Sequence, residues 1–510
     1  MAFYITTPIF YVNAAPHVGH AYTTIGADIL ARHRRQRGED VFFLTGTDEH
    51  GEPVALAAER EGISPKELAD RNAARFEALM PQIDVAHDFF IRTSDERHKV
   101  RVQEVMQRIH DNGFTYKGAY EGWYCPRCAD FKTETEVAEG NTCPIHKIPL
   151  DRESEENWFF KLSAFQERLE QLYAENAGFV GPKVRYNEAH AFIKGGLQDV
   201  SLSRATLKWG VEVPWDSDHV FYVWFDALLN YYTALSFARE GEDLTDRYWP
   251  AAFHLIGKDI LKFHAVFWPA MLMAAGIELP RGEFIHGYLL APTADTGGEM
   301  EKMGKSRGNT IDPFAVIEQY GSDALRFYLF RDVTFGQDGQ VSMEQFATRY
   351  GTELANEYGN LASRTLNMLG RFGGGVIPDA PVEAELEADF TGLADEIAGL
   401  LDAVEITPAL ERIWQRVRRL NRYVEEQAPW ALAKDPEQAE RLATVLRSLA
   451  EGLRVCTVLL HPYMPASTKT LLDALGAEGD DRFALSEARF GSGAAGAVVS
   501  AIPPLFPRDA

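Results

Sequence analysis

The order of apolar and polar positions near the N-terminus predicts a strand–helix–strand unit. Residues 3–11 alternate and are rich in β-forming side chains, which indicates a strand. Residues 18–37 carry apolar side chains at helical spacing and end at a glycine, which indicates a helix. The all-apolar run 41–44 is typical of a strand buried on both faces of a parallel sheet. Ligands are then expected at the carboxyl ends of the strands.

The pattern changes twice further along. Short mixed strands and turns occupy residues 116–215, after which strand and helix patterns resume at residues 220–223, 253–257, 260–275 and 284–290. This predicts one doubly wound, parallel-sheet (Rossmann-like) α/β domain interrupted by an insertion. Beyond residue 343 the pattern predicts a helical bundle. Its expected helices are residues 344–369, 393–404, 408–427 and 437–460, followed by a draped or poorly ordered tail.

We therefore expect the following division of the 510 residues, which are enough for roughly three domains at about 150 residues each. The Rossmann-like domain comprises 1–115 and 216–325, the insertion 116–215, a linking segment 326–350, and the helical domain with its tail 351–510.

Charge and composition narrow the class of protein. The formal net charge of −24 argues against a non-specific nucleic-acid-binding protein, although a local basic surface remains compatible with it. No apolar run approaches the ~20 residues of a membrane span. The N-terminus lacks the features of a signal peptide, so a cytoplasmic protein is expected.

Two histidines stand where the first strand turns into the first helix. A helix N-terminus suits phosphate, and Gly19 lets a ligand approach the backbone closely. The imidazoles of His17 and His20 can donate hydrogen bonds to phosphoryl oxygens. The motif alone also fits two surface histidines, but its position after an N-terminal strand favours a nucleotide site.

A second basic motif lies far downstream. Lys302, Lys305 and Ser306 follow a Gly-containing stretch, residues 291–298. Two lysines on a mobile loop can neutralise charge on a leaving pyrophosphate. A lone K-x-x-K segment is usually a solvated turn, whereas the pair of motifs on this architecture indicates an ATP site.

The two motifs resemble the "HIGH" and "KMSKS" signatures of class I aminoacyl-tRNA synthetases, with Gly304 standing where that family usually has Ser. The resemblance implies amino-acid adenylation with Mg²⁺ on the ATP phosphates. It implies an ATP site at His17, Gly19, His20, Lys302, Lys305 and Ser306. It implies catalytic roles for His17, His20, Lys302, Lys305, Asp48 and Arg204. Without it, Asp48 fits a helix N-cap and Arg204 a surface arginine.

Further segments resemble the methionyl branch of this family. Aromatic walls contact a polarizable thioether favourably, although any one of these aromatic residues alone fits core packing. The implied methionine site is Ile9, Tyr11, Asp48, Trp224, Ala227, Leu228, Tyr231, Asp259, His264 and Trp268. Asp259 is expected to pair with the α-ammonium group and His264 to orient the sulfur.

Two cysteine-containing pairs lie within the insertion: Cys125 with Cys128, and Cys143 with His146. Three thiolates and one imidazole make a closed tetrahedral zinc site, so one structural zinc is expected. Reduced, packed cysteines are the alternative. The set resembles the single zinc knuckle of methionyl enzymes.

Two segments of the helical region resemble the elements with which methionyl enzymes read the anticodon. Trp430 follows a proline, where its ring can stack on an unpaired base, and Asn360 and Arg364 can hydrogen-bond base edges. Several arginines lie within residues 412–422, and we expect them to contact the tRNA backbone rather than form a solvated helix face.

The resemblance implies a methionine–tRNA ligase used in translation and its initiation, with ATP, L-methionine and tRNA(Met), including initiator tRNA, as partners.

The nearest alternative is another class I synthetase. Isoleucyl, valyl and leucyl enzymes carry a larger insertion, and cysteinyl enzymes hold zinc in the amino-acid pocket. A non-catalytic tRNA-binding relative is the other alternative, against which the intact histidine and lysine motifs argue. No DNA or membrane partner is expected. A monomer is expected because no oligonucleotide-binding module follows the helices.

Overall fold

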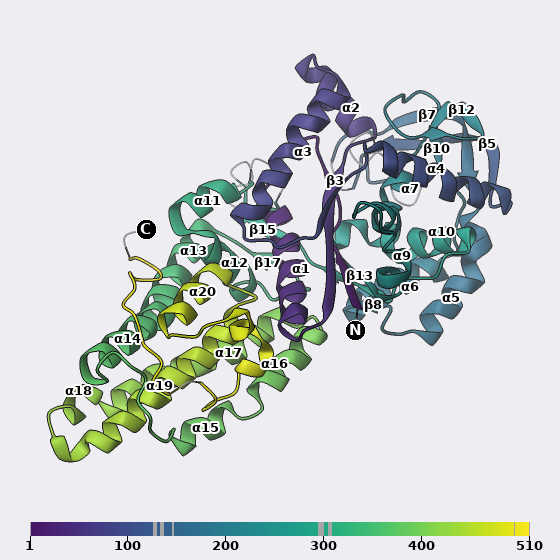
Figure 1. The fold of residues 1–510 in the computed structure, drawn as a ribbon. Helices are drawn as coiled ribbons and strands as arrows, with labels where there is room; N and C mark the ends of the chain where they lie inside the picture. Colours follow the sequence, from purple (N-terminus) through teal and green to yellow (C-terminus); the bar gives the residue numbers. More distant parts are fainter. Residues whose placement is uncertain are drawn as a thin grey trace.

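The computed structural model describes residues 2–125, 130–132, 137–144, 147–293, 300–303, 309–493 and 495–508. Figure 1 shows two parts: strands with surrounding helices toward one end, and a bundle of long helices toward the other. Within these residues, no helix combines the length and the apolar character needed to cross a bilayer.

A parallel sheet forms the centre of the first part. In the described residues it has seven strands, in the order β2-β3-β1-β13-β14-β8, with β4 also paired to β3. The strand β1 lies between β3 and β13, so the chain continues from β1 to strands on both of its sides. At such a point of an open parallel sheet, a crevice forms at the carboxyl ends of the strands. The strands are β1 (Ala2–Thr6), β2 (Phe10–Tyr11), β3 (Asp40–Asp48), β4 (Phe89–Arg92), β8 (Val180–Gly181), β13 (Ala252–Gly257) and β14 (Gly282–His286).

The strand expected over residues 3–11 is divided into β1 and β2. Pro8 has no backbone N–H to donate to a neighbouring strand, so pairing is interrupted there. The chain turns at this point into the next helix, which puts the intervening residues at the edge of the crevice. The helices that follow in this half are α1 (Val18–Gln36), α2 (Glu52–Glu61), α3 (Pro65–Gln82) and α4 (Glu96–Asp111).

The insertion is built on antiparallel pairing. Its larger sheet contains β5 (Thr115–Cys125), β6 (Asp130–Lys132), β7 (Asp151–Phe160) and β9 (Val200–Ser201), and its smaller one β10 (Ser203–Arg204), β11 (Glu212–Val213) and β12 (Asp216–Phe221). The prediction that the strand near residue 220 returns to the parallel domain was wrong, because β12 pairs antiparallel with β10 and β11. The helices α5 (Gln166–Glu175) and α6 (Lys183–Lys194) flank β8, which joins the edge of the parallel sheet.

Short helical segments follow the insertion, and α7, α8, η4 and η5 among them contribute residues to the crevice. The helix expected over residues 260–275 contains a π-helical turn, η5, before its α-helical end. These segments are α7 (Val223–Ala227), α8 (Asn230–Thr233), α9 (Thr245–Tyr248), η4 (Lys258–Ile260), η5 (Phe263–Phe267) and α10 (Trp268–Ala275). A small sheet follows, made of β15 (Leu289–Pro292), β16 (Met300–Lys302) and β17 (Gly339–Gln340).

The second part is helical, as expected. A continuous helical stretch runs from α13 through the π-helical η8 into α14, and the tail packs on it, with Phe506 buried against Tyr350 and Tyr358. The tail is therefore draped on the bundle. The helices are α11 (Pro313–Tyr320), α12 (Ser322–Arg331), α13 (Met343–Arg349), η8 (Tyr350–Gly359), α14 (Asn360–Phe372), α15 (Ala384–Phe390), α16 (Leu393–Asp402), α17 (Ile406–Gln427), α18 (Pro429–Leu432), α19 (Ala439–Leu460) and α20 (Pro465–Ala474).

A fully buried ion pair joins the two parts. Arg326 in α12 donates to Asp28 in α1 at 2.7 Å and to the backbone oxygens of Pro462 and Tyr463 at 2.7 and 2.9 Å. Burial of an unpaired charge costs several kcal/mol, so removal of either partner would loosen this junction. The first helix, whose N-terminus borders the crevice, is thereby fixed against the helical bundle.

Candidate active site

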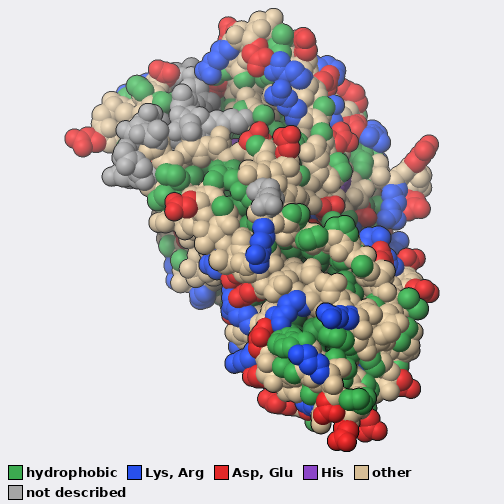
Figure 2. Space-filling model, turned by 90° about the vertical axis from the view of Figure 1, so that its left-hand side faces the viewer, with side chains coloured by type: hydrophobic (Ala, Val, Ile, Leu, Met, Phe, Trp, Pro, Cys, Tyr) green, Lys and Arg blue, Asp and Glu red, His purple; other side chains and the backbone are tan. Residues whose placement is uncertain are grey.

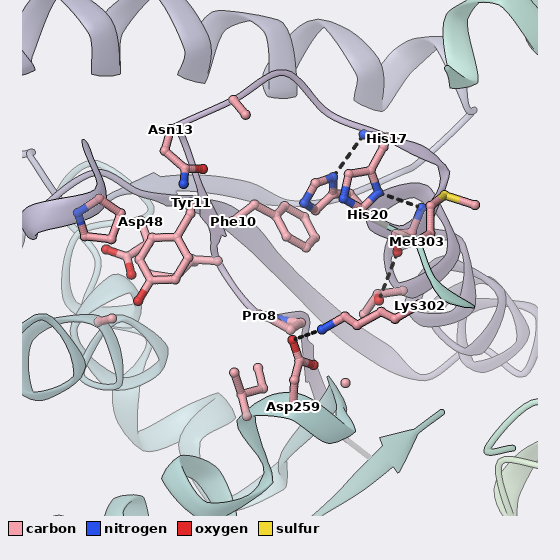
Figure 3. Close-up of a pocket in the computed structure, with 18 of the residues that line it drawn as sticks. Pro8, Phe10, Tyr11, Asn13, His17, His20, Asp48, Asp259, Lys302 and Met303 are labelled. Atoms are coloured by element: carbon pink, nitrogen blue, oxygen red, sulfur yellow. Dashed lines mark hydrogen bonds and ion pairs between the residues drawn. The ribbon is translucent and has the colours of Figure 1, made fainter. Parts of the chain in front are cut away.

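A cavity of about 830 Å³ lies at the carboxyl ends of β1, β3, β13 and β14, where the sheet changes direction. Its walls come from the turn after β1, the N-terminus of α1, the end of β3, α2, α7, α8, η4 and the segment after β14. Figure 3 shows that residues far apart in sequence converge on it. Ligands bind at such switch points in open α/β sheets.

His17 and His20 line the cavity and cap α1 reciprocally. His17 Nδ1 accepts from the Gly19 N–H at 3.1 Å, and His20 Nδ1 accepts from the His17 N–H at 3.0 Å. The ring centres are 3.9 Å apart, and Figure 3 shows the two imidazoles side by side. Because each Nδ1 accepts a hydrogen bond, the hydrogen of each neutral ring resides on Nε2. Each ring thus presents the donor that a phosphoryl oxygen requires.

The helix cap formed by His17 requires a glycine at position 19, in addition to the close approach that this glycine offers a ligand. A Cβ at this position would lie 2.8 Å from Cε1 and 2.9 Å from Nδ1 of His17. Real Cβ contacts are longer, so a larger residue would push the imidazole out of its capping position. The glycine therefore fixes the geometry of the first histidine.

Lys302 reaches the same cavity from β16. Its Nζ lies 2.9 Å from Asp259 Oδ2 and 4.2 Å from the centre of the Tyr288 ring, and Figure 3 shows it extended toward Asp259. Burial works to raise the pKa of Asp259, but the Lys302 ammonium lowers it below its usual range. The other predicted members of this motif, Lys305 and Ser306, lie outside the described residues.

The other end of the cavity is apolar and aromatic. Trp224 stacks on Phe263 with ring centres 3.9 Å apart, and Tyr11 meets Trp224 edge-on at 6.4 Å. Such walls suit a flexible side chain with a polarizable sulfur. Nine of the ten residues predicted for methionine line this cavity: Ile9, Tyr11, Asp48, Trp224, Ala227, Leu228, Tyr231, Asp259 and His264.

Tyr231 and His264 are joined within this wall. His264 Nδ1 lies 3.1 Å from the Ile260 carbonyl oxygen, so it carries the hydrogen, and Nε2 accepts from the Tyr231 hydroxyl at 2.8 Å. Burial lowers the pKa of His264 to about 4, which keeps the ring neutral near pH 7. This imidazole therefore adds no positive charge to the aromatic wall near pH 7.

Asp48 is the buried carboxylate at the end of β3. Its residue is 2% exposed, and no described group donates to its Oδ1. Burial raises the pKa of Asp48 well above its usual range, the charges of Asp226 and Glu49 raise it further, and a hydrogen bond from the His50 N–H opposes them. A buried acceptor without a donor is costly, so this oxygen is suited to a cationic ligand group.

Two residues predicted for the site do not line the cavity described here. Trp268 is fully buried behind Tyr231, and its indole N–H donates to His254 at 3.1 Å. Arg204 lies in the insertion, buried, with its guanidinium 4.3 Å from the centre of the Tyr222 ring. The direct roles assigned to Trp268 and Arg204 stay predictions.

The residues predicted to read the anticodon come together from two helices. The Arg364 guanidinium, in α14, is 5.6 Å from the centre of the Trp430 ring, in α18, and Trp430 is 41% exposed. Asn360 lies one turn before Arg364 on α14. Figure 2 shows hydrophobic side chains gathered among Lys and Arg side chains over the helical end of this face. Aromatic rings beside cations are surfaces on which unpaired bases stack.

Three arginines of α17 form ion pairs within the protein. Arg418 contacts Glu353 at 3.0 Å, and Arg419 contacts Asp389 at 3.0 Å. Arg412 contacts Glu396 at 2.9 Å. The expected tRNA-backbone contact stays a prediction, because these three arginines have carboxylate partners on neighbouring helices, just as Arg364 has in Glu425 at 2.7 Å.

Comparison with known proteins places both parts of the chain in one family. The family model of class I tRNA synthetases (M) matches residues 3–154 and 146–366. The model of the anticodon-binding domain of methionyl tRNA ligase matches residues 374–507. The chain belongs to the methionyl-tRNA synthetases.

Full-length relatives agree with this assignment. The methionine–tRNA ligase of Streptomyces coelicolor is 45% identical, over 99% of this synthetase and 96% of its own length. The methionyl-tRNA synthetase of Mycobacterium tuberculosis, in complex with methionyl-adenylate, superposes with a TM-score of 0.93 at 41% identity, covering 99% of both chains. The apo form of that enzyme gives a TM-score of 0.85 at 38% identity, covering 99% of this chain and 98% of its own.

Family membership decides between the alternatives left by the sequence. Both family models describe methionyl enzymes, and each relative named above is a methionyl enzyme. The isoleucyl, valyl, leucyl and cysteinyl branches are therefore excluded. This synthetase is a class I methionine–tRNA ligase. The expected α/β domain with a parallel sheet and the helical anticodon domain are confirmed.

Two of the four predicted zinc ligands of the synthetase lie in the described residues. Cys125 and Cys143 are fully buried and pack in one small cluster with Leu150. Their predicted partners, Cys128 and His146, lie outside the described residues. One cysteine from each half of the motif thus belongs to the same buried cluster, an arrangement compatible with a zinc knuckle.

Sequence reasoning missed several residues that line the synthetase cavity. His286 is the last residue of β14 and Tyr288 follows it, and the rule that singled out the carboxyl end of β3 would have found them. Arg60 lines the cavity from α2, and Ile148 lines it from beside the cysteine cluster. No local signal distinguishes these two, because a helix and an insertion loop bring them to the cavity from a distance.

Proposed function

We propose that this cavity performs both steps that join L-methionine to tRNA(Met). In the first step, a methionine carboxylate oxygen attacks the α-phosphorus of ATP, and pyrophosphate leaves. In the second, a ribose hydroxyl of the terminal adenosine of the tRNA attacks the adenylate carbonyl carbon, and AMP leaves. No protein nucleophile is needed, so positioning and electrostatics supply the catalysis. Mg²⁺ bound together with ATP would supply further positive charge to the phosphates, beside His17, His20 and Lys302.

The polarity of the cavity carries this proposal. One end holds the N-terminus of α1 with His17 and His20, together with Lys302, all of which suit phosphate. The other end holds aromatic walls and the buried Asp48 carboxylate. A methionine with its side chain against the aromatic walls and its ammonium group on the carboxylate would direct its own carboxylate toward the phosphate end.

We propose that Asp48 binds the α-ammonium group of methionine. Asp259 instead holds the side chain of Lys302 in place. The sequence assigned the ammonium to Asp259, but Oδ2 of that carboxylate is paired with the Lys302 ammonium at 2.9 Å. Asp48, by contrast, has an oxygen that no described donor meets. Asp259 then holds the lysine at the phosphate end until ATP offers a stronger anionic partner.

We further propose that Arg364, Asn360 and Trp430 bind the anticodon. Replacement of Trp430 by alanine is expected to lower kcat/KM for tRNA(Met) charging about 10- to 100-fold, because stacking of one base contributes about 1–3 kcal/mol. Methionine-dependent ATP–pyrophosphate exchange should be unchanged, since the cavity is remote from α18. Charging and exchange are measured on the same preparation.

Phe192 provides the matched control, because it is also an aromatic residue with 41% exposure but lies on α6 of the insertion. Phe192→Ala should leave both activities unchanged. Equal loss of charging and exchange in Trp430→Ala would contradict the anticodon role, as would unchanged charging.

The predicted zinc is tested by metal analysis. Wild-type protein is expected to contain about one zinc per chain, and chelation is expected to destabilise the insertion, because ligand binding and local folding are coupled. Cys143→Ala should lose the metal. Cys456→Ala should retain it, because Cys456 is buried in α19 of the helical bundle. Wild type without zinc, or Cys143→Ala with a full complement, would refute the knuckle.

Several finer points of the proposal stay predictions. They are the domain limits given above other than the one at residue 216, the monomeric state, a cytoplasmic location, and the use of initiator tRNA. Domain 116–215 is expected to be the connecting insertion and 351–510 the anticodon-binding domain. The strand β8 shows that the insertion and the parallel sheet share an edge.

A further inference from the structure

A carboxylate with an imidazole on each side lies buried behind the amino-acid end of the cavity. Asp226 Oδ2 is 2.5 Å from His50 Nδ1, and Asp226 Oδ1 is 2.7 Å from His98 Nε2. The three side chains are 0–2% exposed. None of them lines the cavity. We refer to these three residues as the His–Asp–His bridge.

The bridge joins three separate elements. His50 follows β3, Asp226 lies in α7, and His98 lies in α4. The ring of His98 is held in turn by Thr233 in α8, whose Oγ1 is 2.8 Å from Nδ1. A fixed ring orientation is what allows the other nitrogen to hold a carboxylate in one place.

Two residues of the bridge, and the threonine that holds His98, each lie two positions along the chain from a residue that lines the cavity. His50 is two positions after Asp48, and Asp226 is two positions after Trp224. Thr233 is two positions after Tyr231. A displacement of any of these elements would therefore change the separation between the Asp48 carboxylate and the aromatic wall.

The charge at the centre of the bridge is fixed by its neighbours. Burial alone raises the pKa of Asp226, yet the charges and hydrogen bonds of His50 and His98 lower it to about 2. A buried carboxylate that loses a hydrogen-bond partner is strongly destabilised in place and its segment shifts to find another. Loss of His98 would act on α7 without removing any atom from the cavity.

We propose that the His–Asp–His bridge is a positioning device that sets the distance between the Asp48 carboxylate and the Trp224–Tyr231 wall. His98 acts in it only through Asp226. The bridge governs the fit of the amino acid, which spans that distance, and has little influence on ATP at the opposite end. This inference rests on the proposed methionine site.

The test is methionine-dependent ATP–pyrophosphate exchange with the full chain and four variants. His98→Ala should raise the KM for methionine about tenfold and leave the KM for ATP within about twofold, because misplacement by a fraction of an ångström already costs this much. His98→Gln should restore most of the methionine KM, since its amide can donate to Asp226 and accept from Thr233. His110→Ala is the control, because His110 lies on the same helix and bonds Thr115 instead.

Thr233→Val keeps the shape of the hydroxyl residue but frees the His98 ring, and should raise the methionine KM about threefold. Thermal unfolding shows whether His98→Ala folds. If it does not, the methionine KM of Thr233→Val tests the proposal in its place. An unchanged methionine KM in Thr233→Val, equal increases in both KM values, or no rescue by His98→Gln would overturn the proposal. Absence of methionine-dependent exchange in the wild type would instead overturn the proposed function on which it rests.

Discussion

Asp48→Asn is expected to raise the KM for methionine about 10²-fold in ATP–pyrophosphate exchange and to leave the KM for ATP nearly unchanged. The substitution keeps the shape of the side chain and removes its charge. The Asp48 side chain is buried at the end of β3 beside the aromatic wall, and no described group donates to Oδ1. In the variant, the ammonium group of methionine would lose a charge-assisted hydrogen bond at a buried position.

The dependence of this KM on pH gives a second readout. Burial, then Asp226 and Glu49, raise the pKa of Asp48, so the neutral acid persists to higher pH than for an exposed aspartate. Only the ionised form pairs with an ammonium group. The methionine KM of the wild type should therefore rise as pH falls through the raised pKa, and Asp48→Asn should lose this dependence.

Asp40 lies at the opposite end of the same strand, where it accepts from Arg247 and Tyr248, and it supplies the control. Asp40→Asn should leave the methionine KM unchanged. A methionine KM in Asp48→Asn equal to that of the wild type would contradict the assignment, and so would an equal rise in the KM for ATP.

His17→Asn is expected to lower kcat for adenylation about 10²- to 10³-fold, the usual cost of losing one donor to transition-state charge. The KM for methionine should change little, because His17 is at the phosphate end. Asparagine is among the best N-cap residues, so its side-chain oxygen can replace Nδ1 as acceptor from the Gly19 N–H. The variant thus preserves the cap and removes the Nε2–H donor.

His17→Ala separates the two roles of this histidine. It should show the same loss of kcat and, in addition, a loss of about 1 kcal/mol in stability from the missing cap. Thermal unfolding and single-turnover adenylation measure the two effects. Normal kcat in His17→Asn together with loss in His17→Ala would show that the histidine serves only the helix.

Much of the site followed from rules that act over a few residues. A helix N-terminus after a strand placed His17 and His20, and the carboxyl end of a buried strand placed Asp48. Both positions line the cavity. Spacing along one helix likewise placed Asn360 near Arg364, but only the structure shows Trp430 beside Arg364, because this contact joins α18 to α14.

Tertiary contacts explain what local rules missed. Trp268 was expected in the methionine site together with His264, which lies four positions earlier. The π-helical turn at Phe263–Phe267 adds a residue to one turn, which rotates the tryptophan out of the cavity wall. The pairing of Lys302 with Asp259 depends on where β16 lies beside β15, which no nearby residue indicates.

The charge pattern of α17 does not by itself tell which arginines contact a ligand. The arginines of α17 had the density of a nucleic-acid contact, yet Arg418 and Arg419 pair with carboxylates of η8 and α15. An acidic protein offers many such partners, so the number of arginines in a helix does not predict how many reach a ligand. Pairing can be judged only from the folded arrangement.

The most direct test of the central claim is ATP–pyrophosphate exchange measured with the wild type across a panel of amino acids. If the cavity joins a phosphate site to a methionine pocket, exchange should depend on L-methionine and should be negligible with isoleucine, valine, leucine and cysteine at equal concentration. Exchange that depends on one of those amino acids and not on methionine, or no exchange with any of them, would contradict the account.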